Sequence, residues 1–116
     1  MIRAELEKDA HSFSLRVSGH AGYGRRGEDT VCAAVSSLIH GLVSYVNLLE
    51  RQGLARSPTK TAAEPGWAWI YLCPEPQAMD NAAGAFALAG RTLALLGENF
   101  PGNIQLTEKR RSKNDK

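Results

Sequence analysis

Apolar residues between positions 30 and 52 recur at steps of three and four, which is the period of one face of an α-helix. Asp29 precedes this pattern as an N-cap, and Gly53 follows it as a stop signal. A long helix with one apolar face needs a second element to cover that face. The pattern therefore predicts a helix packed on a sheet or on another helix. Its predicted core positions are Val31, Val35, Leu38, Leu42, Tyr45 or Val46, and Leu49.

Strand-like patterns lie on both sides of this helix. Residues 2–6 and 13–17 alternate apolar and polar side chains, which predicts two half-buried strands joined by a turn at residues 9–12. Residues 54–61 and 67–73 predict a second hairpin, in which the run WAWIYLC is apolar enough to be buried on both faces. Two hairpins separated by a helix are therefore expected.

A second helical pattern occupies residues 77–100 and ends at the Pro-Gly pair of residues 101–102. Gly84 and Gly90 within it are expected to let another element approach closely. A short strand is predicted at residues 104–106. The second half of the chain thus repeats the hairpin-then-helix pattern and adds a final strand.

The element order is β-β-α-β-β-α-β. It predicts an α+β fold: a single-domain sandwich over residues 1–108, with two long helices packed on a largely antiparallel sheet. Residues 109–116 carry five basic groups and one acid and are expected to form a disordered basic tail. Because Lys and Arg neutralise phosphates, such a tail allows a weak contact with nucleic acid, although short charged termini are usually only solvated.

The sequence shows no apolar run close to the ~20 residues that span a bilayer, and its N-terminus MIRAELEKD lacks a signal-peptide pattern. We therefore expect a cytoplasmic protein without a membrane segment. Cys32 and Cys73 are expected to be free thiols, because the cytoplasm keeps thiols reduced. No C-x-x-C or H-x-x-x-H pair is present, so neither a metal nor another cofactor is expected.

The segment GYGRRG at residues 22–27 formally matches the GxGxxG loop of dinucleotide-binding folds. That fold needs a parallel strand after the helix, ending in an acid ~20 residues beyond the glycines. Glu50 lies at about that distance, but inside the predicted helix, and the strand before the loop belongs to a hairpin. A nucleotide site is therefore not expected, and the glycines are interpreted as a mobile or positive-φ loop.

Cys32 lies three residues after Asp29, in the first turn of the predicted helix, where free N–H groups and the helix dipole favour an anionic thiolate. His20 ends the preceding strand, and the loop between them is long enough to bring its imidazole to the sulfur. One interpretation is that Cys32 is a nucleophile and His20 its general base. The other is that Cys32 is only a buried structural residue and His20 only a polar surface residue. Ser36, one turn after Cys32, either helps to orient the thiolate or a substrate group, or bonds to a backbone carbonyl.

The run GHAGYGRRGEDTVCAAVSSL at residues 19–38 resembles the ribosomal-processing cysteine protease family, Prp. The family pattern is GHA, an aromatic residue, and then G-x-D-hydrophobic-V-C-A-A-V-S. Thr30 stands where the family usually has isoleucine, and the likeness extends more loosely over the rest of the chain. The resemblance implies a cytoplasmic endopeptidase that removes the N-terminal extension of a large-subunit ribosomal protein, number twenty-seven, during ribosome assembly. Members cut after an aromatic residue and before a small one.

The same resemblance implies that Cys32 is the nucleophile and His20 the general base. Asp29 either caps the helix or orients His20, and capping alone suffices to explain it. Backbone N–H groups near Cys32 and Ala33 are expected to act as oxyanion donors. The further motif positions are Gly19, Ala33 and Ser36.

The loop over residues 21–28 is expected to cover the active site, with Tyr23, Gly24 and Gly27 on the substrate side. Tyr23 would form one wall of an apolar pocket for the aromatic residue of the substrate. The family is known as homodimers, so the expected partners are the ribosomal protein precursor and a second copy of the chain.

Two alternatives to the protease stay open at this point. The basic tail motivates a non-enzymatic module associated with the ribosome or with RNA. The cysteine and histidine also suit another thiol hydrolase, such as a thioesterase, which would leave a peptide bond intact.

Overall fold

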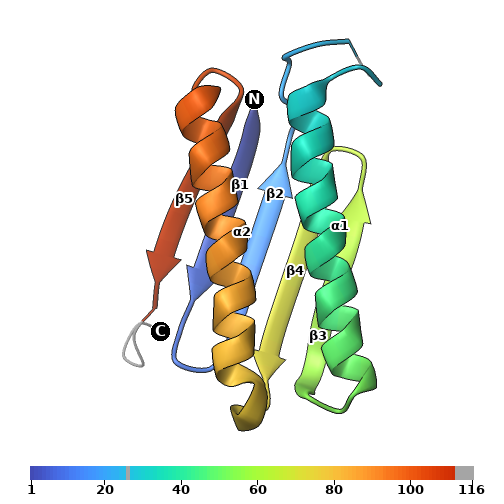
Figure 1. Cartoon of the computed structure of the whole chain (residues 1–116), viewed down its shortest axis with the longest axis vertical. Coiled ribbons are helices and arrows are strands. Elements are labelled where there is room, and N and C mark those ends of the chain that lie inside the picture. Colours follow the sequence, from blue (N-terminus) through green and yellow to red (C-terminus); the bar gives the residue numbers. More distant parts are fainter. Residues whose placement is uncertain (26, 112–116) are drawn as a thin grey trace.

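The computed structural model describes residues 1–25 and 27–111, which form a five-stranded sheet with two long helices on one face (Figure 1). The elements occur in the order predicted from the sequence, with one short 3-10 helix added before the second long helix. They are β1 (Ile2–Lys8), β2 (Phe13–Ser18), α1 (Thr30–Arg51), β3 (Ala55–Glu64), β4 (Trp67–Pro74), η1 (Pro76–Ala78), α2 (Met79–Asn99) and β5 (Ile104–Arg110).

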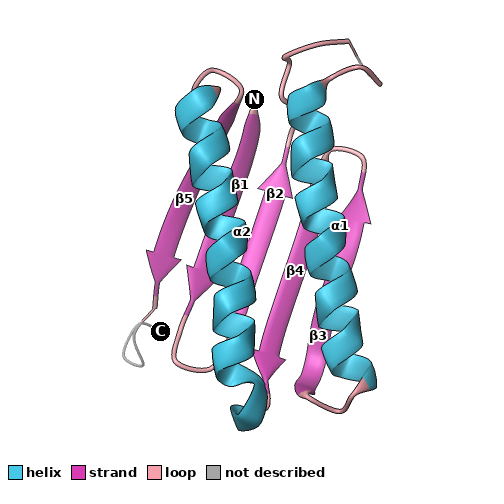
Figure 2. Cartoon of the chain, in the orientation of Figure 1, coloured by secondary structure: helices cyan, strands magenta, loops and turns pink. Residues whose placement is uncertain are grey.

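The strands lie side by side in the order β3-β4-β2-β1-β5 (Figure 2). Neighbouring strands are antiparallel except for β1 and β5, which run parallel because α2 returns the chain to the end of the sheet where β1 begins. The predicted α+β sandwich with a largely antiparallel sheet is therefore confirmed.

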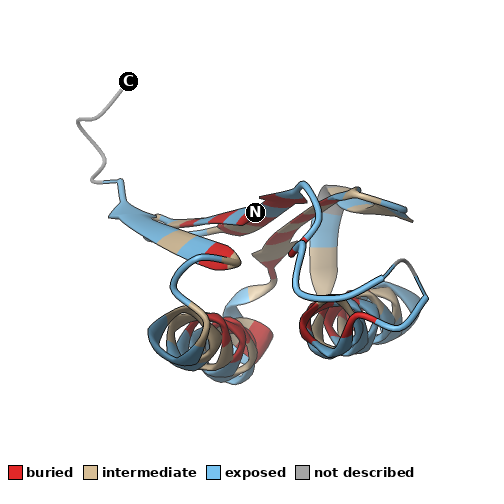
Figure 3. Ribbon diagram, turned by 90° about the horizontal axis from the view of Figure 1, so that it is seen from above, coloured by how far each residue is buried: buried red, intermediate tan, exposed pale blue. Residues whose placement is uncertain are grey.

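Both helices bury their apolar faces against the same side of the sheet (Figure 3). On α1, Ile39 is buried and the predicted Leu38 is only half-buried, so the inner face is rotated slightly from the prediction. On α2, Phe86 stacks on Phe13 of β2 with ring centroids 5.0 Å apart. The buried residues of α1 are Val31, Val35, Ile39, Leu42, Val46 and Leu49.

No apolar run close to a bilayer's span was found in the sequence, but by length and composition alone α1 is apolar enough to cross a membrane. Its apolar face, however, packs on the sheet, and its N-terminal turn holds Cys32 close to the end of β2. This is the position of a core helix, a class of helix that passes the same test.

The strand β4 is buried on one face only, contrary to the prediction from its apolar sequence. Ala68 and Ile70 point toward the helices and are buried, whereas Trp67 points the other way and is 46% exposed. Within residues 1–25 and 27–111, no element covers this second face of the sheet (Figure 3). The sequence WAWIYLC of β4 is apolar throughout because aromatic side chains also occupy the positions that point away from the helices.

Of the two α2 glycines predicted to allow a close approach, Gly84 and Gly90, only Gly90 has a close neighbour. A Cβ at Gly90 of α2 would lie 2.8 Å from Leu6 Cδ2 of β1, so the glycine lets the helix approach the sheet. A Cβ at Gly84 would meet no atom within 4 Å, so the prediction of a close approach there is wrong.

The boundary of the domain lies later than the predicted residue 108. Lys109 and Arg110 belong to β5, and the N–H of Arg111 donates to the carbonyl of Lys8 at 2.8 Å. These residues of the predicted tail therefore extend the sheet, because β1 offers its edge over its whole length. Residues 112–116 lie outside the described residues.

We predict that Gly19→Ala destabilises the fold strongly. Gly19 follows β2 with a φ of +93°, and a Cβ there would lie 2.3 Å from the backbone oxygen of Met1. The free energy of unfolding, measured by urea denaturation, should fall by about 1–3 kcal/mol from the backbone strain alone. Gly41→Ala in α1 is the control: with open space around it, it should stabilise by about 0.4–1 kcal/mol. Equal effects of the two substitutions would contradict this account.

Candidate active site

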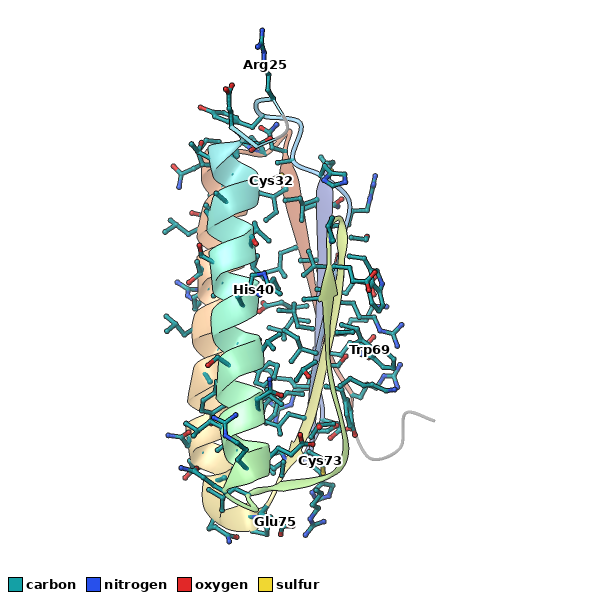
Figure 4. All side chains as sticks on the ribbon, turned by 90° about the vertical axis from the view of Figure 1, so that its right-hand side faces the viewer. Arg25, Cys32, His40, Trp69, Cys73 and Glu75 are labelled. Carbon is teal, nitrogen blue, oxygen red and sulfur yellow. The ribbon has the colours of Figure 1, made fainter. Side chains whose placement is uncertain are left out.

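Cys32 lies in the first turn of α1, where the loop after β2 meets the helix (Figure 4). Its side chain is half-buried, and its Sγ accepts a hydrogen bond from the N–H of Ala21 at 3.3 Å. Ala21 is itself only 2% exposed. The Cys32 sulfur is therefore held against a backbone donor that comes from a buried residue.

The carboxylate of Asp29 joins the start of α1 to the start of the loop. Its Oδ1 accepts from the N–H groups of Val31 and Cys32, both at 3.0 Å. Its Oδ2 accepts from the N–H groups of Tyr23 at 2.8 Å and Gly24 at 3.0 Å. The hydrogen bond from Cys32, supported by the other three and opposed by burial, holds the pKa of Asp29 below its ordinary value.

The predicted capping role of Asp29 is therefore confirmed. Among the described residues no hydrogen bond links Asp29 to His20, since both carboxylate oxygens are occupied by backbone groups. The N–H groups of Cys32 and Ala33, predicted as oxyanion donors, already have partners within the chain: the first donates to the Asp29 side chain, and the second donates to the Asp29 carbonyl at 3.0 Å. The N–H that faces the sulfur belongs to Ala21 instead.

His20 reaches the same end of the molecule but lies against the turn between β3 and β4. A Cβ at Gly66 in that turn would be 2.8 Å from His20 Nε2, and the N–H of Gly19 donates to the Gly66 carbonyl at 2.9 Å. The imidazole is exposed, and within the described part of the chain no hydrogen bond joins it to Cys32. The residue after His20, Ala21, makes the contact with the sulfur.

The glycine-rich loop binds an anion, but this anion is the chain's own Asp29 carboxylate. Gly24 supplies one of its N–H donors, and Gly27 has a φ of +87° that a residue with a side chain rarely adopts. Tyr23 is 54% exposed, and its ring meets Phe100, at the end of α2, edge-on with centroids 5.2 Å apart. Residue 26 of the loop lies outside the described residues.

Two further motif residues, Ala33 and Ser36, lie on the exposed side of α1. In residues 1–25 and 27–111 the Ser36 hydroxyl makes no hydrogen bond, so its predicted bond to a backbone carbonyl is not seen. Sequence reasoning missed Asn103, whose Nδ2 donates to the Ala21 carbonyl at 2.9 Å across 82 residues of chain. Only the Pro-Gly-Asn turn that carries Asn103 was visible in the sequence.

Cys73, the second cysteine, lies at the other end of the molecule, and both thiols are free as predicted (Figure 4). A cavity of about 330 Å³ lies beside Cys73 and is lined by no residue of the Cys32 site. Across the described residues, no group of three or more His, Cys, Asp or Glu side chains is placed to hold a metal ion.

A cysteine at a helix N-terminus, with a donor on its sulfur and a histidine next to that donor in the chain, is typical of a thiol hydrolase. Residues 1–105 match the family described as cysteine protease Prp. The chain belongs to this family, and the resemblance seen in residues 19–38 is confirmed. It is a cysteine protease, which decides against the RNA-associated module and the thioesterase.

Known relatives cover nearly the whole chain. The ribosomal processing cysteine protease Prp of Bacillus subtilis (strain 168) is 26% identical over 112 residues, 92% of this chain and 96% of its own length. The Mycoplasma genitalium protein of the same name is 30% identical over 94 residues, 81% of this chain and 86% of its own. An essential ribosomal processing protease Prp from S. aureus, solved with a covalently linked product peptide, has a TM-score of 0.69. It is 22% identical and matches 94% of this chain and 100% of its own.

We predict that Asp29→Ala lowers the stability of the fold and makes it less sensitive to acid. Because the folded-state pKa lies below the ordinary 3.8, the contribution of Asp29 is complete above that pH and is lost as pH falls through the folded-state pKa. Urea unfolding at pH 7 and near pH 2 measures both effects. The variant should also slow peptide cleavage, on the order of a hundredfold, because the loop loses its fixed position.

Asp9→Ala is the matched control for this prediction. Although burial favours a higher value, hydrogen bonds from His11 and Ser12 hold the pKa of Asp9 below its ordinary value. It lies in the turn between β1 and β2, and the Asp9→Ala variant should lose acid sensitivity but keep its cleavage rate. Two results would contradict this prediction: cleavage by Asp29→Ala at the wild-type rate, or an equal fall in the cleavage rate of both variants.

Proposed function

We propose that this cysteine protease removes the N-terminal extension of the large-subunit ribosomal protein number twenty-seven during ribosome assembly in the cytoplasm. The observation that carries the proposed site is the hydrogen bond from Ala21 to Cys32 Sγ, which ties the residue after His20 to a thiol at a helix N-terminus. The substrate class is supported by the relatives described as ribosomal processing proteases and by the motif over residues 19–38.

In the proposed reaction, His20 takes the proton of the Cys32 thiol and the thiolate attacks the scissile carbonyl. The peptide C–N bond then breaks as the imidazolium protonates the leaving amine, which leaves a thioester on Cys32. Water attacks the thioester, giving one proton to His20, and the acid product leaves as the proton returns to the thiol. For the first step the imidazole turns from Gly66 toward the sulfur, a rotation about its own side-chain bonds.

We further propose that the loop over residues 21–28 contributes to the substrate site. The Tyr23 ring combines high exposure with packing against Phe100, so it offers a fixed apolar edge to the aromatic residue before the cleaved bond. Asp29 fixes the beginning of this loop through Tyr23 and Gly24. The chain would therefore hold the aromatic residue close to the helix start that bears Cys32.

The test is co-expression of the chain with the full-length ribosomal protein, followed by measurement of its intact mass. We expect wild type to remove the extension, and Cys32→Ala and His20→Ala to leave it in place, with rates lower by a factor of about 10³ or more. Cys73→Ala is the matched control and should cleave as wild type does.

Each part of the proposal has its own contrary result. A precursor that stays intact with a folded wild-type chain contradicts the proposed substrate. Removal of the extension by Cys32→Ala or by His20→Ala contradicts the proposed site, whatever the substrate. Loss of cleavage in Cys73→Ala would assign the reaction to the other end of the molecule.

We also propose that the enzyme is a homodimer that pairs through the uncovered face of the sheet. Trp67 is 46% exposed there, so the uncovered face presents a large aromatic side chain that a second copy could cover. The outward residues of β1 and β2 include both Glu5 and Arg16, a mixture that suits a two-fold copy of itself. A nucleic acid or a membrane surface would favour uniform positive charge, so neither is proposed as a partner.

Trp67→Glu should therefore weaken the dimer, with a dissociation constant raised by about thirtyfold or more, because a large aromatic residue would be replaced by a charge at a buried contact. Size-exclusion chromatography with light scattering should show wild type at twice the mass of one chain and the variant close to a single mass. Leu88→Glu, which alters a 67% exposed residue on α2, is the control and should stay dimeric. A monomeric wild type, or a dimeric Trp67→Glu, contradicts this proposal.

A further inference from the structure

We infer that Asn103 is a positioning residue for the Cys32 thiol and acts through the main chain of Ala21. The inference rests on the proposed role of Cys32 as the nucleophile. Asn103 lies in the turn between α2 and β5, and its Nδ2 donates to the Ala21 carbonyl at 2.9 Å. Ala21 in turn donates its N–H to Cys32 Sγ at 3.3 Å. A side-chain amide far away in the sequence is thus connected to the sulfur through one residue.

The main chain of Asn103 is itself held on both sides. Its N–H donates to the Phe100 carbonyl at 2.9 Å, and its carbonyl accepts from the N–H of Ile2 at 2.8 Å. The turn is therefore fixed to the end of α2 and to the start of β1. The side-chain amide projects from a rigid support, so its hydrogen bond restrains Ala21 rather than following its movements.

A second contact from the same turn reaches the loop, since the Phe100 ring packs edge-on against Tyr23. An apolar ring contact restricts distance but does little to set the direction of a peptide group. The hydrogen bond from Asn103 does set direction, because it requires the Ala21 carbonyl to point toward the amide. The carbonyl belongs to the peptide after Ala21 and the N–H to the peptide before it, so fixing the carbonyl leaves only φ and ψ of Ala21 between the Asn103 contact and the N–H that donates to Cys32 Sγ.

The chemical consequence is a higher reactivity of Cys32 toward electrophiles, because a cysteine sulfur reacts as an anion and a hydrogen bond to the sulfur stabilises that anion. One typical hydrogen bond changes an equilibrium by about fivefold. A less stable thiolate is also a stronger nucleophile, with a Brønsted coefficient of about 0.4–0.5, so the loss is partly offset. The rate of alkylation of Cys32 at neutral pH should therefore fall by about two- to threefold when the Asn103 hydrogen bond is removed.

The experiment compares alkylation of the two cysteines of the full chain by iodoacetamide at pH 7, with each site followed by peptide mass mapping. Asn103→Asp keeps the shape of the side chain but removes the donor, and Asn103→Ala removes both. Cys73, at the opposite end of the molecule, is the internal reference in the same sample (Figure 4). The matched control is Asn99→Ala, because Asn99 Nδ2 also donates to a backbone carbonyl, that of Leu95 at 2.9 Å, within α2.

We expect both Asn103 variants to lower the alkylation rate of Cys32 by about two- to threefold relative to that of Cys73. Asn99→Ala should leave the ratio of these two rates unchanged. Peptide cleavage by the Asn103 variants should lose kcat and keep KM, because the thiol changes and the substrate contacts do not. If both Asn103 variants show the same ratio of Cys32 to Cys73 alkylation rates as wild type, the inference is overturned. An equal change at both cysteines also overturns it, since such a change marks a general loosening of the fold.

The alkylation ratio needs no substrate, so it separates this inference from the proposed function. If wild type leaves the ribosomal precursor intact, the proposed substrate fails, while a slowed Cys32 in the Asn103 variants still supports the link through Ala21. If wild type cleaves and the alkylation ratio is unchanged in those variants, the proposed function stands and the role of Asn103 is refuted.

Discussion

The carboxylate of Asp29 accepts backbone hydrogen bonds from two segments that must meet for the site to exist, the start of α1 and the start of the loop after β2. A buried carboxylate is costly unless its oxygens are satisfied, and here backbone N–H groups satisfy both. Since those donors come from both segments, releasing either one leaves the charge incompletely solvated. One side chain thus couples the cap of the helix that bears Cys32 to the loop that follows His20.

The sheet provides the frame on which this coupling acts. β1 lies between β2, which leads to His20, and β5, which follows the turn carrying Asn103. The hydrogen bond from Ile2 to Asn103 joins that turn to β1, and the bond from Asn103 to Ala21 then crosses to the end of β2. Residues far apart in the sequence therefore support the sulfur because the strand order makes them neighbours.

Local signals in the sequence were sufficient for much of this structure. Periodicity located both helices and the strand order along the chain, and the position of Asp29 before a helical pattern identified the cap. The outer face of β4 was misjudged because Trp67 and its aromatic neighbours are apolar whether or not another layer covers them. The contact between Asn103 and Ala21 could not be predicted, because an asparagine in a turn gives no indication of a partner so distant in the sequence. The sequence also did not show that Asp29 and the helix itself already use the N–H groups of Cys32 and Ala33, which were predicted as oxyanion donors.

The central claim is that this arrangement makes Cys32 the nucleophile of a covalent reaction. The most direct measurement is an acid quench of a single turnover, followed by peptide mass mapping of the quenched chain. The substrate is a peptide with a bond between an aromatic and a small residue. We expect the N-terminal part of the substrate to be found as a thioester on the fragment containing Cys32. Cleavage with the acyl group on Cys73, or with no acylated cysteine in a quench fast enough to precede hydrolysis, would contradict it.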